Sequence, residues 1–332
     1  MYEIVITGVA GFIGSSLAYT LCEKGYSVIG IDNLYCGYLS NLSWVKPTHK
    51  FIFHQSSIDT TELNEWIKKD QIIIHLACIS SLPTNQEDPP FSYTNNVSSM
   101  VHLLEVCRIK GVKQIIHAST NAIYENTDIF PTPENIVIKP NLIYSLVKKH
   151  CEDLIQSFHN VYGLPFSILR LFNIYGSNQD AQRKNPSLIP YLFDCFKNKK
   201  QPILHSDGEQ KRDYVYLDDL INLIEKLIEI EPLNTEVNVC SGITISVNEI
   251  VKTVQEIMNV NDIEPIYRDP TLLWEKSSKI WEGEYPFSKE RMINEVKKYS
   301  LGDPSKAIQL VNWNAKTTFK EGIKLIYENH KF

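Results

Sequence analysis

Tyr144 and Lys148 are four residues apart, a spacing that brings two side chains onto one face of a helix. A phenol titrates near pH ~10, so Tyr144 can accept a proton at neutral pH only if a neighbouring charge stabilises its phenolate. The ammonium group of Lys148 can supply that charge and can also bond the ribose of a cofactor. Because an ordinary amphipathic helix can carry the same pair on its surface, the chemistry depends on the elements around it.

A glycine-rich turn near the N-terminus is the element that would bring a cofactor to this pair. Residues 3–7 are apolar and mostly β-branched, as in a buried strand, and a helical pattern starts at Phe12. Gly8 would permit the tight turn between them, Gly11 would let the backbone approach a pyrophosphate, and Gly14 would let the helix pack closely. The alternative is a turn that binds nothing; in this context the pattern favours a dinucleotide site.

Asp32 follows the second predicted strand, residues 27–31, about twenty residues after the turn. A carboxylate at this place can hydrogen-bond the ribose hydroxyls of the adenosine. No arginine stands beside Asp32, and the carboxylate would repel the additional phosphate of NADP. The sequence therefore predicts NAD as the cofactor.

The composition limits the other classes of function. The chain has 332 residues and a net charge of −6, with no basic stripe that would indicate nucleic-acid binding. Its seven cysteines are scattered without metal-ligand spacing, which favours a reducing compartment over disulfides or a zinc site. We find no signal-peptide pattern and no apolar run near the ~20 residues of a membrane span. We expect a cytoplasmic protein without membrane insertion or a bound metal.

Strand and helix patterns alternate through the first half of the chain, which predicts an α/β fold with a Rossmann-type, doubly wound parallel sheet. Further strands are predicted at 51–54, 71–76, 114–118 and 166–171, and helices near 60–68, 94–110 and 144–162. We expect an NAD-binding domain over 1–172, with a returning segment near 211–245. A smaller C-terminal α/β substrate lobe would comprise 173–210 and 246–332.

The chain also resembles a known family, the NAD-dependent nucleotide-sugar epimerases and dehydratases of the extended short-chain dehydrogenase/reductase type. The resemblance covers nearly the whole length and depends on motifs in the family's order. After the glycine turn these are residues 32–34, 75–77, 87–89, 95–97, 118–120, the pair Tyr144 and Lys148, 170–176, 207–215 and 303–307, before Trp313. Any one motif could arise by chance, whereas the ordered set is specific.

The resemblance implies roles for individual residues. Thr120 would share the proton of a sugar hydroxyl with Tyr144, and Lys148 would support both Tyr144 and the cofactor. Asn173 and Arg212 would hold the diphosphate of the substrate, with Ser81, Thr120 and Asn121 near the sugar. The residues expected to contact NAD are Gly8, Gly11, Phe12, Ile13, Gly14, Asp32, Asn33, Ser57, Ile58, Leu76, Ala77, Tyr144 and Lys148.

Departures from the family pattern narrow the reaction. In the family's 4,6-dehydratases an acid and a base follow the threonine, whereas Asn121 and Ala122 follow Thr120 in this chain. We therefore predict a nucleotide-diphosphate-sugar 4-epimerase, which oxidises C4, rotates the 4-ketosugar and reduces it again. A 4-dehydrogenase and a CDP-sugar 2-epimerase stay open as alternatives. A dehydratase and a non-catalytic protein that binds NAD or sugar nucleotides are less favoured.

Other local questions stay open at this point. Arg212 could instead pair with Asp213 or Asp218, and either Ser57 or Asp59 could reach the adenine. Residues 262–295 match no part of the family pattern and could form a lid, a base-stacking surface or, as we favour, ordinary packing.

The family resemblance also implies polysaccharide biosynthesis and a homodimer through a four-helix bundle. That bundle would use Val97, Val101 and Leu104 together with Leu154, Ile155 and Phe158, which are spaced as on helix faces.

Overall fold

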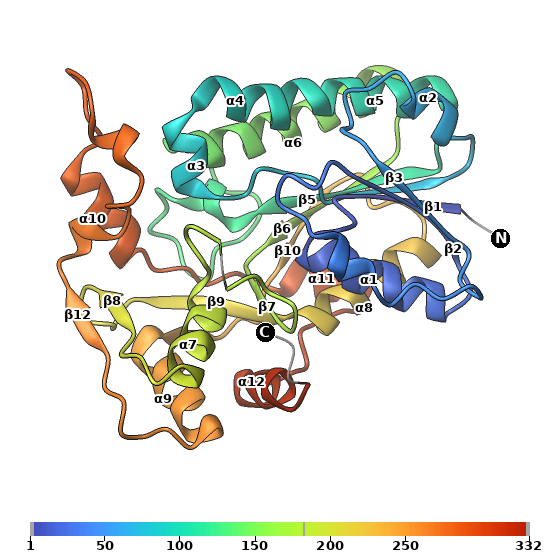
Figure 1. Cartoon of the computed structure of the whole chain (residues 1–332). Coiled ribbons are helices and arrows are strands. Elements are labelled where there is room, and N and C mark those ends of the chain that lie inside the picture. The colour runs from blue at the N-terminus through green and yellow to red at the C-terminus, as the bar shows by residue number, and fades with distance from the viewer. Residues whose placement is uncertain (1–2, 182, 330–332) are drawn as a thin grey trace.

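The computed structural model describes residues 3–181 and 183–329, and its centre is a seven-stranded parallel sheet (Figure 1). The strand order is β10-β6-β5-β4-β1-β2-β3, so the order reverses between β1 and β4. The strands are β1 (Glu3–Thr7), β2 (Ser27–Asp32), β3 (Phe51–Gln55), β4 (Ile72–His75), β5 (Gln114–Thr120), β6 (Phe166–Leu171) and β10 (Glu236–Val239). This arrangement confirms the predicted doubly wound Rossmann-type sheet.

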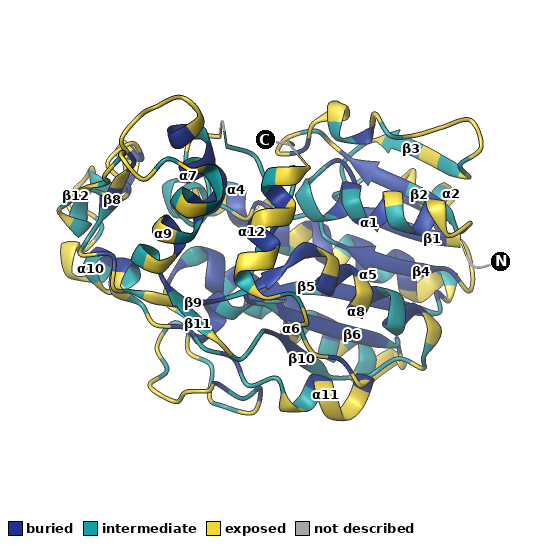
Figure 2. Cartoon of the chain, turned by 90° about the horizontal axis from the view of Figure 1, so that it is seen from below, coloured by how far each residue is buried: buried dark blue, intermediate teal, exposed yellow. Residues whose placement is uncertain are grey.

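Helices cover both faces of this sheet, because its strands are apolar on both sides. In β1, Ile4 and Ile6 belong to one core and Val5 to the other, as alternation along a strand requires. The first core includes α1 (Phe12–Glu23), α8 (Leu217–Glu229) and α11 (Ser305–Val311). The second includes α2 (Leu63–Trp66), α5 (Ser99–Lys110) and α6 (Ile143–Tyr162), and Figure 2 shows the buried sheet between the helices.

A smaller lobe lies beyond the carboxyl ends of the strands. In it, β9 (Lys211–Tyr216) pairs with β7 (Asn173–Tyr175) and β11 (Thr244–Ser246), and β8 (Ile203–His205) pairs with β12 (Ile266–Arg268). The helices of this lobe are α7 (Leu188–Lys197), α9 (Val247–Met258), α10 (Lys289–Lys297) and α12 (Phe319–Glu328). Tyr175, Tyr214 and Tyr216 pack in its core, so these aromatic residues have a structural role.

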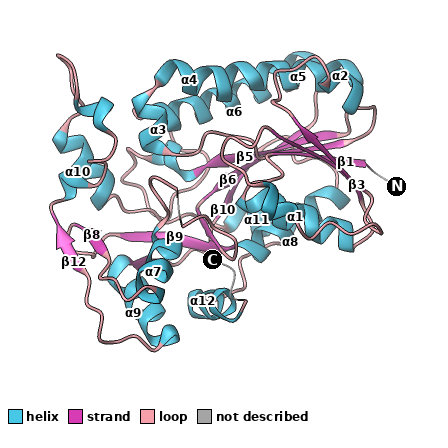
Figure 3. Cartoon of the chain, viewed as in Figure 1, coloured by secondary structure: helices cyan, strands magenta, loops and turns pink. Residues whose placement is uncertain are grey.

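The segment between β12 and α10 is mostly loop, with short 3₁₀ helices at Pro270–Leu272 and Ser278–Trp281 (Figure 3). Trp274 is buried and Trp281 packs beside it, in a cluster that also contains Leu142 from the main domain. These contacts support the packing interpretation of residues 262–295.

Two helix predictions need correction. The helix expected near 60–68 is only the single turn of α2, because Thr60 to Glu62 form turns and the chain is extended at Ile67. The helix expected over 94–110 begins as a π-helix at Thr94–Ser98, and only α5 is regular. Two further helices, α3 (Leu82–Glu87) and α4 (Pro89–Tyr93), were not predicted; they start at the caps Ser81 and Asp88. Among the described residues, no helix is long and apolar enough to cross a membrane.

Candidate active site

A cavity of about 640 Å³ lies at the carboxyl ends of the central strands and continues into the smaller lobe. Parallel α/β sheets place ligand sites at this edge, beside the point where the strand order reverses. The structure brings every residue proposed for cofactor, substrate or catalysis to the wall of this one cavity. They are Gly8, Gly11, Phe12, Ile13, Gly14, Asp32, Asn33, Ser57, Ile58, Leu76, Ala77, Ser81, Thr120, Asn121, Tyr144, Lys148, Asn173 and Arg212.

The glycine turn has the geometry of a cradle for a phosphate group. Gly8 has φ of +75°, and a Cβ atom there would lie 2.7 Å from the backbone nitrogen of Ala77. A Cβ atom on Gly14 would overlap the carbonyl oxygen of Gly8. No side chain caps the start of α1, so the N-terminal end of this helix can receive an anion. Shape and polarity here fit the pyrophosphate of a dinucleotide.

Asp32 joins the glycine turn to the next loop. One carboxylate oxygen accepts from the backbone N–H of Ala10 at 2.9 Å, and the other accepts from that of Leu34 at 2.8 Å. Burial raises the pKa of Asp32, and the two backbone hydrogen bonds oppose that rise. Beside it, the side-chain amide of Asn33 donates to Ser57 Oγ at 3.1 Å. The carboxylate is therefore fixed at the place where the ribose of NAD would lie.

Thr120, Tyr144 and Lys148 meet at the middle of the cavity. Thr120 ends β5, Tyr144 lies in the first turn of α6, and Lys148 follows one turn later. Burial, followed by the nearby Cys78, raises the pKa of Tyr144, and a hydrogen bond with Thr120 opposes the rise. Lys148 Nζ donates to the carbonyl oxygen of Ala118 at 2.5 Å. Burial therefore favours the protonated phenol, and the lysine is anchored to the strand that carries Thr120.

Two buried histidines lie under Lys148. His75 and His117 stack with ring centroids 5.2 Å apart, and His117 Nε2 is 3.3 Å from Lys148 Nζ. Burial and then the charge of Lys148 lower the pKa of His75 to about 3, and the same causes lower that of His117 well below its usual range. Both rings are therefore neutral at pH 7.

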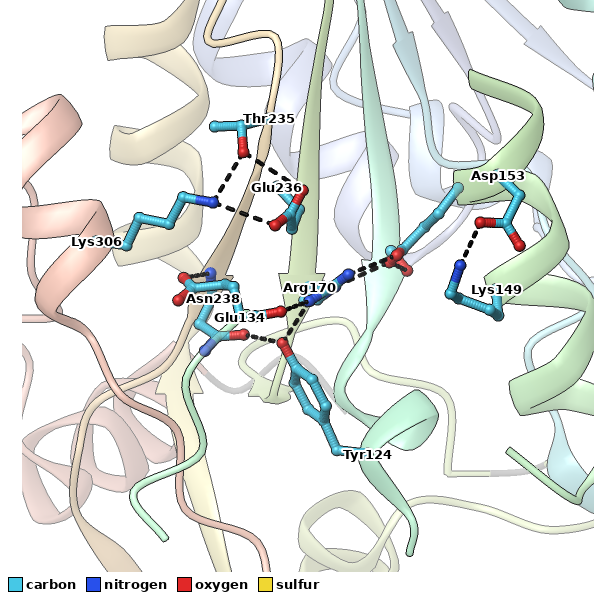
Figure 4. A network of polar contacts seen from close by, with 11 residues as sticks. Tyr124, Glu134, Lys149, Asp153, Arg170, Thr235, Glu236, Asn238 and Lys306 are labelled. Atoms are coloured by element: carbon cyan, nitrogen blue, oxygen red, sulfur yellow. Dashed lines mark hydrogen bonds and ion pairs between the residues drawn. The ribbon is translucent and has the colours of Figure 1, made fainter. Parts of the chain in front are cut away.

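A buried network holds the end of β5 from below (Figure 4). Arg170 of β6 forms a salt bridge with Glu152 of α6, with Nη2 2.8 Å from Oε2, and Glu152 accepts from Ser119 Oγ at 2.5 Å. Arg170 Nη1 also donates to the hydroxyl of Tyr124 at 2.8 Å and to the Glu134 carbonyl. Because Ser119 precedes Thr120, this network supports the backbone that presents the threonine.

The far end of the cavity is lined by charged groups of the smaller lobe. Arg212 donates to the carbonyl oxygens of Glu295 and Val296, at 3.1 Å each, and to that of Lys211. The alternative that Arg212 pairs with Asp213 is wrong, because that carboxylate accepts from Ser241, Gly242 and Gly302. Within the described residues, Arg212 has no ion pair with Asp218 either. An arginine has five N–H donors, so these contacts leave donors for a ligand.

Several residues at this end were missed by the sequence analysis. Glu295 and Lys298, at and just beyond the end of α10, line the cavity beside Arg212, and Arg183 and Lys184 line it from the loop before α7. Burial lowers the pKa of Lys298, although Glu295 nearby opposes that effect. The basic dipeptide at 183–184 was visible in the sequence, but no spacing rule connects it or Lys298 to the motifs.

Comparisons with known proteins agree with this geometry. The family model described as GDP-mannose 4,6 dehydratase matches residues 5–326. A putative UDP-glucose 4-epimerase of Methanocaldococcus jannaschii is 31% identical over 327 residues, which cover 97% of this chain and 96% of that protein. The structure of UDP-glucose 4-epimerase from Thermotoga maritima with UDP-glucose has a TM-score of 0.84 at 30% identity, covering 98% of this chain and 97% of that one. A UDP-N-acetylglucosamine 4-epimerase from Methanobrevibacter ruminantium, in complex with UDP-N-acetylmuramic acid, has a TM-score of 0.85 at 26% identity, covering 99% and 98%.

Proposed function

The chain belongs to the NAD-dependent nucleotide-sugar epimerase/dehydratase family of extended short-chain dehydrogenases/reductases, and on this premise we propose that it is a nucleotide-diphosphate-sugar 4-epimerase. One observation carries the proposal most directly. Thr120, Tyr144 and Lys148 line the cavity together, and the two residues after Thr120 are Asn121 and Ala122. The site thus has groups for moving a hydroxyl proton but lacks the acid and base that dehydration would need after Thr120.

The matching family model carries the name of a dehydratase, so we ask whether a carboxylate linked to the segment around Thr120 could act in dehydration. Glu152 is engaged by Arg170 and Ser119, and Glu125 is engaged by Arg291. Neither lines the cavity among the described residues. This favours epimerisation over dehydration.

In the proposed reaction, Thr120 bonds the hydroxyl at C4 of the sugar, and its proton passes to Tyr144. Bound NAD supplies a reversible acceptor for the hydride from C4. Lys148, anchored to β5, would favour the phenolate form of Tyr144 during that transfer. After the 4-ketosugar has turned its other face, C4 would regain the hydride and the oxygen would regain the proton by the same route, so no net oxidation results.

For the substrate we propose a UDP-sugar, because several relatives that match this chain over nearly the whole length of both proteins are named as UDP-sugar 4-epimerases. Arg212, Lys298 and Asn173, whose amide donates to the Asp213 carbonyl at 2.8 Å, line the cavity, and we propose that they bind the diphosphate. A guanidinium fork and an ammonium suit phosphate oxygens.

We also propose the domain division predicted from the sequence, with 1–172 and a returning segment near 211–245 binding NAD, and 173–210 and 246–332 binding the sugar nucleotide. The position of β10 in the large sheet supports the returning segment, although β9 belongs to the smaller sheet and α11 packs in the core of the large one. A role in polysaccharide biosynthesis and a cytoplasmic location stay predictions.

A homodimer through α5 and α6 is proposed with a corrected set of residues. Leu104 and Ile155 are fully buried in the core and cannot reach a partner. Val101, Ile109, Val161 and Tyr162 are exposed on the same two helices. Light scattering should give a dimer mass, and Val101→Glu with Val161→Glu should shift it to the monomer mass; a monomeric wild type would contradict the proposal.

The function itself is tested by incubating the protein, without added cofactor, with UDP-glucose, UDP-glucuronate and UDP-N-acetylglucosamine and following the sugar protons by NMR. We expect one of these to equilibrate with its C4 epimer. A ketosugar that appears only with added NAD would instead indicate a 4-dehydrogenase, and conversion at C2 of a CDP-sugar a 2-epimerase.

A further inference from the structure

The helix that carries Tyr144 starts without a cap of its own. Leu142 occupies the N-cap position of α6 and has no side-chain hydrogen bond to the helix. Two side chains from elsewhere serve the exposed N–H groups instead. Glu125 Oε1 accepts from the backbone N–H of Leu142 at 2.9 Å and from that of Asn141, and Gln86 Oε1 accepts from that of Ile143 at 3.3 Å. An acceptor supplied in this way stabilises a helix start and limits how it can move.

Glu125 also belongs to the other catalytic element. It directly follows the 3₁₀ helix Asn121–Tyr124, whose N-cap residue is Thr120. Leu142 lies two residues before Tyr144. One carboxylate therefore ties the segment that presents Thr120 to the start of the helix that presents Tyr144.

A positively charged side chain of α10 pairs with the Glu125 carboxylate. The Glu125 side chain has no exposed surface and forms an ion pair with Arg291 Nη2. Arg291 also contacts Glu295 Oε2 at 3.3 Å. A buried carboxylate without a partner is costly, so removal of Arg291 would disturb the site of Glu125.

Apolar contacts hold α10 in the same position. Leu142 packs in one cluster with Trp274 of the preceding segment and with Met292 and Val296 of α10. At its C-terminal end, α10 receives two hydrogen bonds from Arg212, the residue proposed to bind the diphosphate. The helix thus contacts Glu125 and Leu142, beside the two catalytic elements, as well as the substrate end of the cavity.

We propose that Glu125 and Arg291 form a positioning pair that sets the distance between Thr120 and Tyr144 for proton transfer. The inference rests on the proposed epimerase function. It joins Glu125, Leu142 and the segment before α10, which the family pattern leaves unmatched, in one structural device.

The test compares Arg291→Met and Arg291→Lys with Arg268→Met as the matched control. Arg268 belongs to the same lobe and pairs with Glu275 in a partly exposed position, 2.9 Å from Nη1 to Oε1. For Arg291→Met we expect kcat to fall about 10- to 100-fold, because small displacements of reacting groups have effects of this size. KM and the amount of bound NAD should change less than about twofold, Arg291→Lys should recover most of kcat, and Arg268→Met should equal the wild type.

The pH profile separates positioning from loss of folded protein. The hydrogen bond with Thr120 lowers the pKa of Tyr144, so a weakened contact should move the acid limb of kcat to higher pH in Arg291→Met. An unchanged kcat, or a fall in kcat that matches a fall in bound NAD with an unmoved profile, would overturn the inference.

Glu125→Gln provides a second route if Arg291→Met does not fold, since it removes the buried charge while keeping an acceptor oxygen. It should show the same shift of the acid limb with a smaller loss of kcat; an unmoved limb would overturn the inference. The wild type is assayed first on the three UDP-sugars, so failure of the proposed function is seen separately as absence of turnover by the unmodified enzyme.

Discussion

The cofactor end of the cavity is formed by the backbone of one short stretch of chain, whereas the substrate end is formed by charged side chains from distant segments. Between Gly8 and Asp32, a positive φ, a close approach to Ala77 and two backbone hydrogen bonds shape the site. At the other end, Arg212, Glu295 and Lys298 come from β9 and from the end of α10. At the cofactor end, the effect of a substitution should therefore depend on the volume of the new side chain. At the substrate end, it should depend on the charge of the side chain.

Tyr144→Phe changes the residue that lies between the cofactor end and the substrate end, and it should have the largest effect on kcat. Loss of the phenolic proton carrier should lower kcat about 10²- to 10⁴-fold, the usual contribution of general acid–base catalysis. Neither end loses a binding group at its own site, so bound NAD and the affinity for UDP-sugar should be nearly unchanged. NMR turnover and calorimetric binding measure the two quantities. Tyr93→Phe, on α4, is the control, and retained turnover in Tyr144→Phe would contradict the mechanism.

Gly14→Val tests the cofactor end by volume alone. Its Cβ would overlap the Gly8 carbonyl, so the turn or the helix must move away from the pyrophosphate position. We expect bound NAD to fall roughly 10- to 100-fold, equivalent to about 1.4–2.7 kcal/mol. Gly25→Asn is a suitable control, because Gly25 has open space around it and asparagine tolerates its positive φ. The bound NAD is measured by denaturing each protein and quantifying the NAD that is released. Equal amounts of NAD in Gly14→Val and Gly25→Asn would contradict the steric argument.

The contrast between the two ends also explains what the sequence could predict. A strand, a turn and a helix that follow one another determine the cofactor end, so the spacing of Gly8, Gly14 and Asp32 was sufficient to locate it. Arg212 was found by its motif, but its partners were not, because Asp213 receives hydrogen bonds from residues 241, 242 and 302. Lys298 and the contact between Glu125 and Arg291 depend on how α10 docks, which no local pattern records.

Arg212→Met tests the substrate end by charge. Hydrogen bonds to charged groups contribute about 1.5–3 kcal/mol, so KM for the UDP-sugar should rise roughly 10- to 100-fold. Bound NAD should be unchanged, because Asp32 and the glycine turn lie at the other end of the cavity. Arg268→Met again serves as the control for a cation of the same lobe outside the cavity. A KM equal to that of the wild type in Arg212→Met would contradict the proposal that this end of the cavity binds the diphosphate.

The smallest predicted effect is on the pH dependence of stability. It compares the buried, neutral histidines under Lys148 with the paired charges of the smaller lobe. The folded-state pKa of His75 is about 3, below the ~6.5 expected for an unfolded chain. Between pH 7.5 and 5.5 the unfolded chain therefore takes up a proton that folded His75 does not, and stability falls as the pH decreases. For one such group the free energy of unfolding should drop by about 1.4 kcal/mol over this interval.

His75→Gln keeps a side chain that can bond Thr7 Oγ1, which lies 2.7 Å from His75 Nδ1, and removes the titration. Urea unfolding at both pH values should give a smaller difference for His75→Gln than for the wild type or for His205→Gln, whose ring lies in the lobe beside the Asp269 carbonyl. An identical pH difference in all three proteins would mean that His75 takes up a proton in the folded state as well. The buried site under Lys148 would then not differ from the substrate end by holding neutral groups.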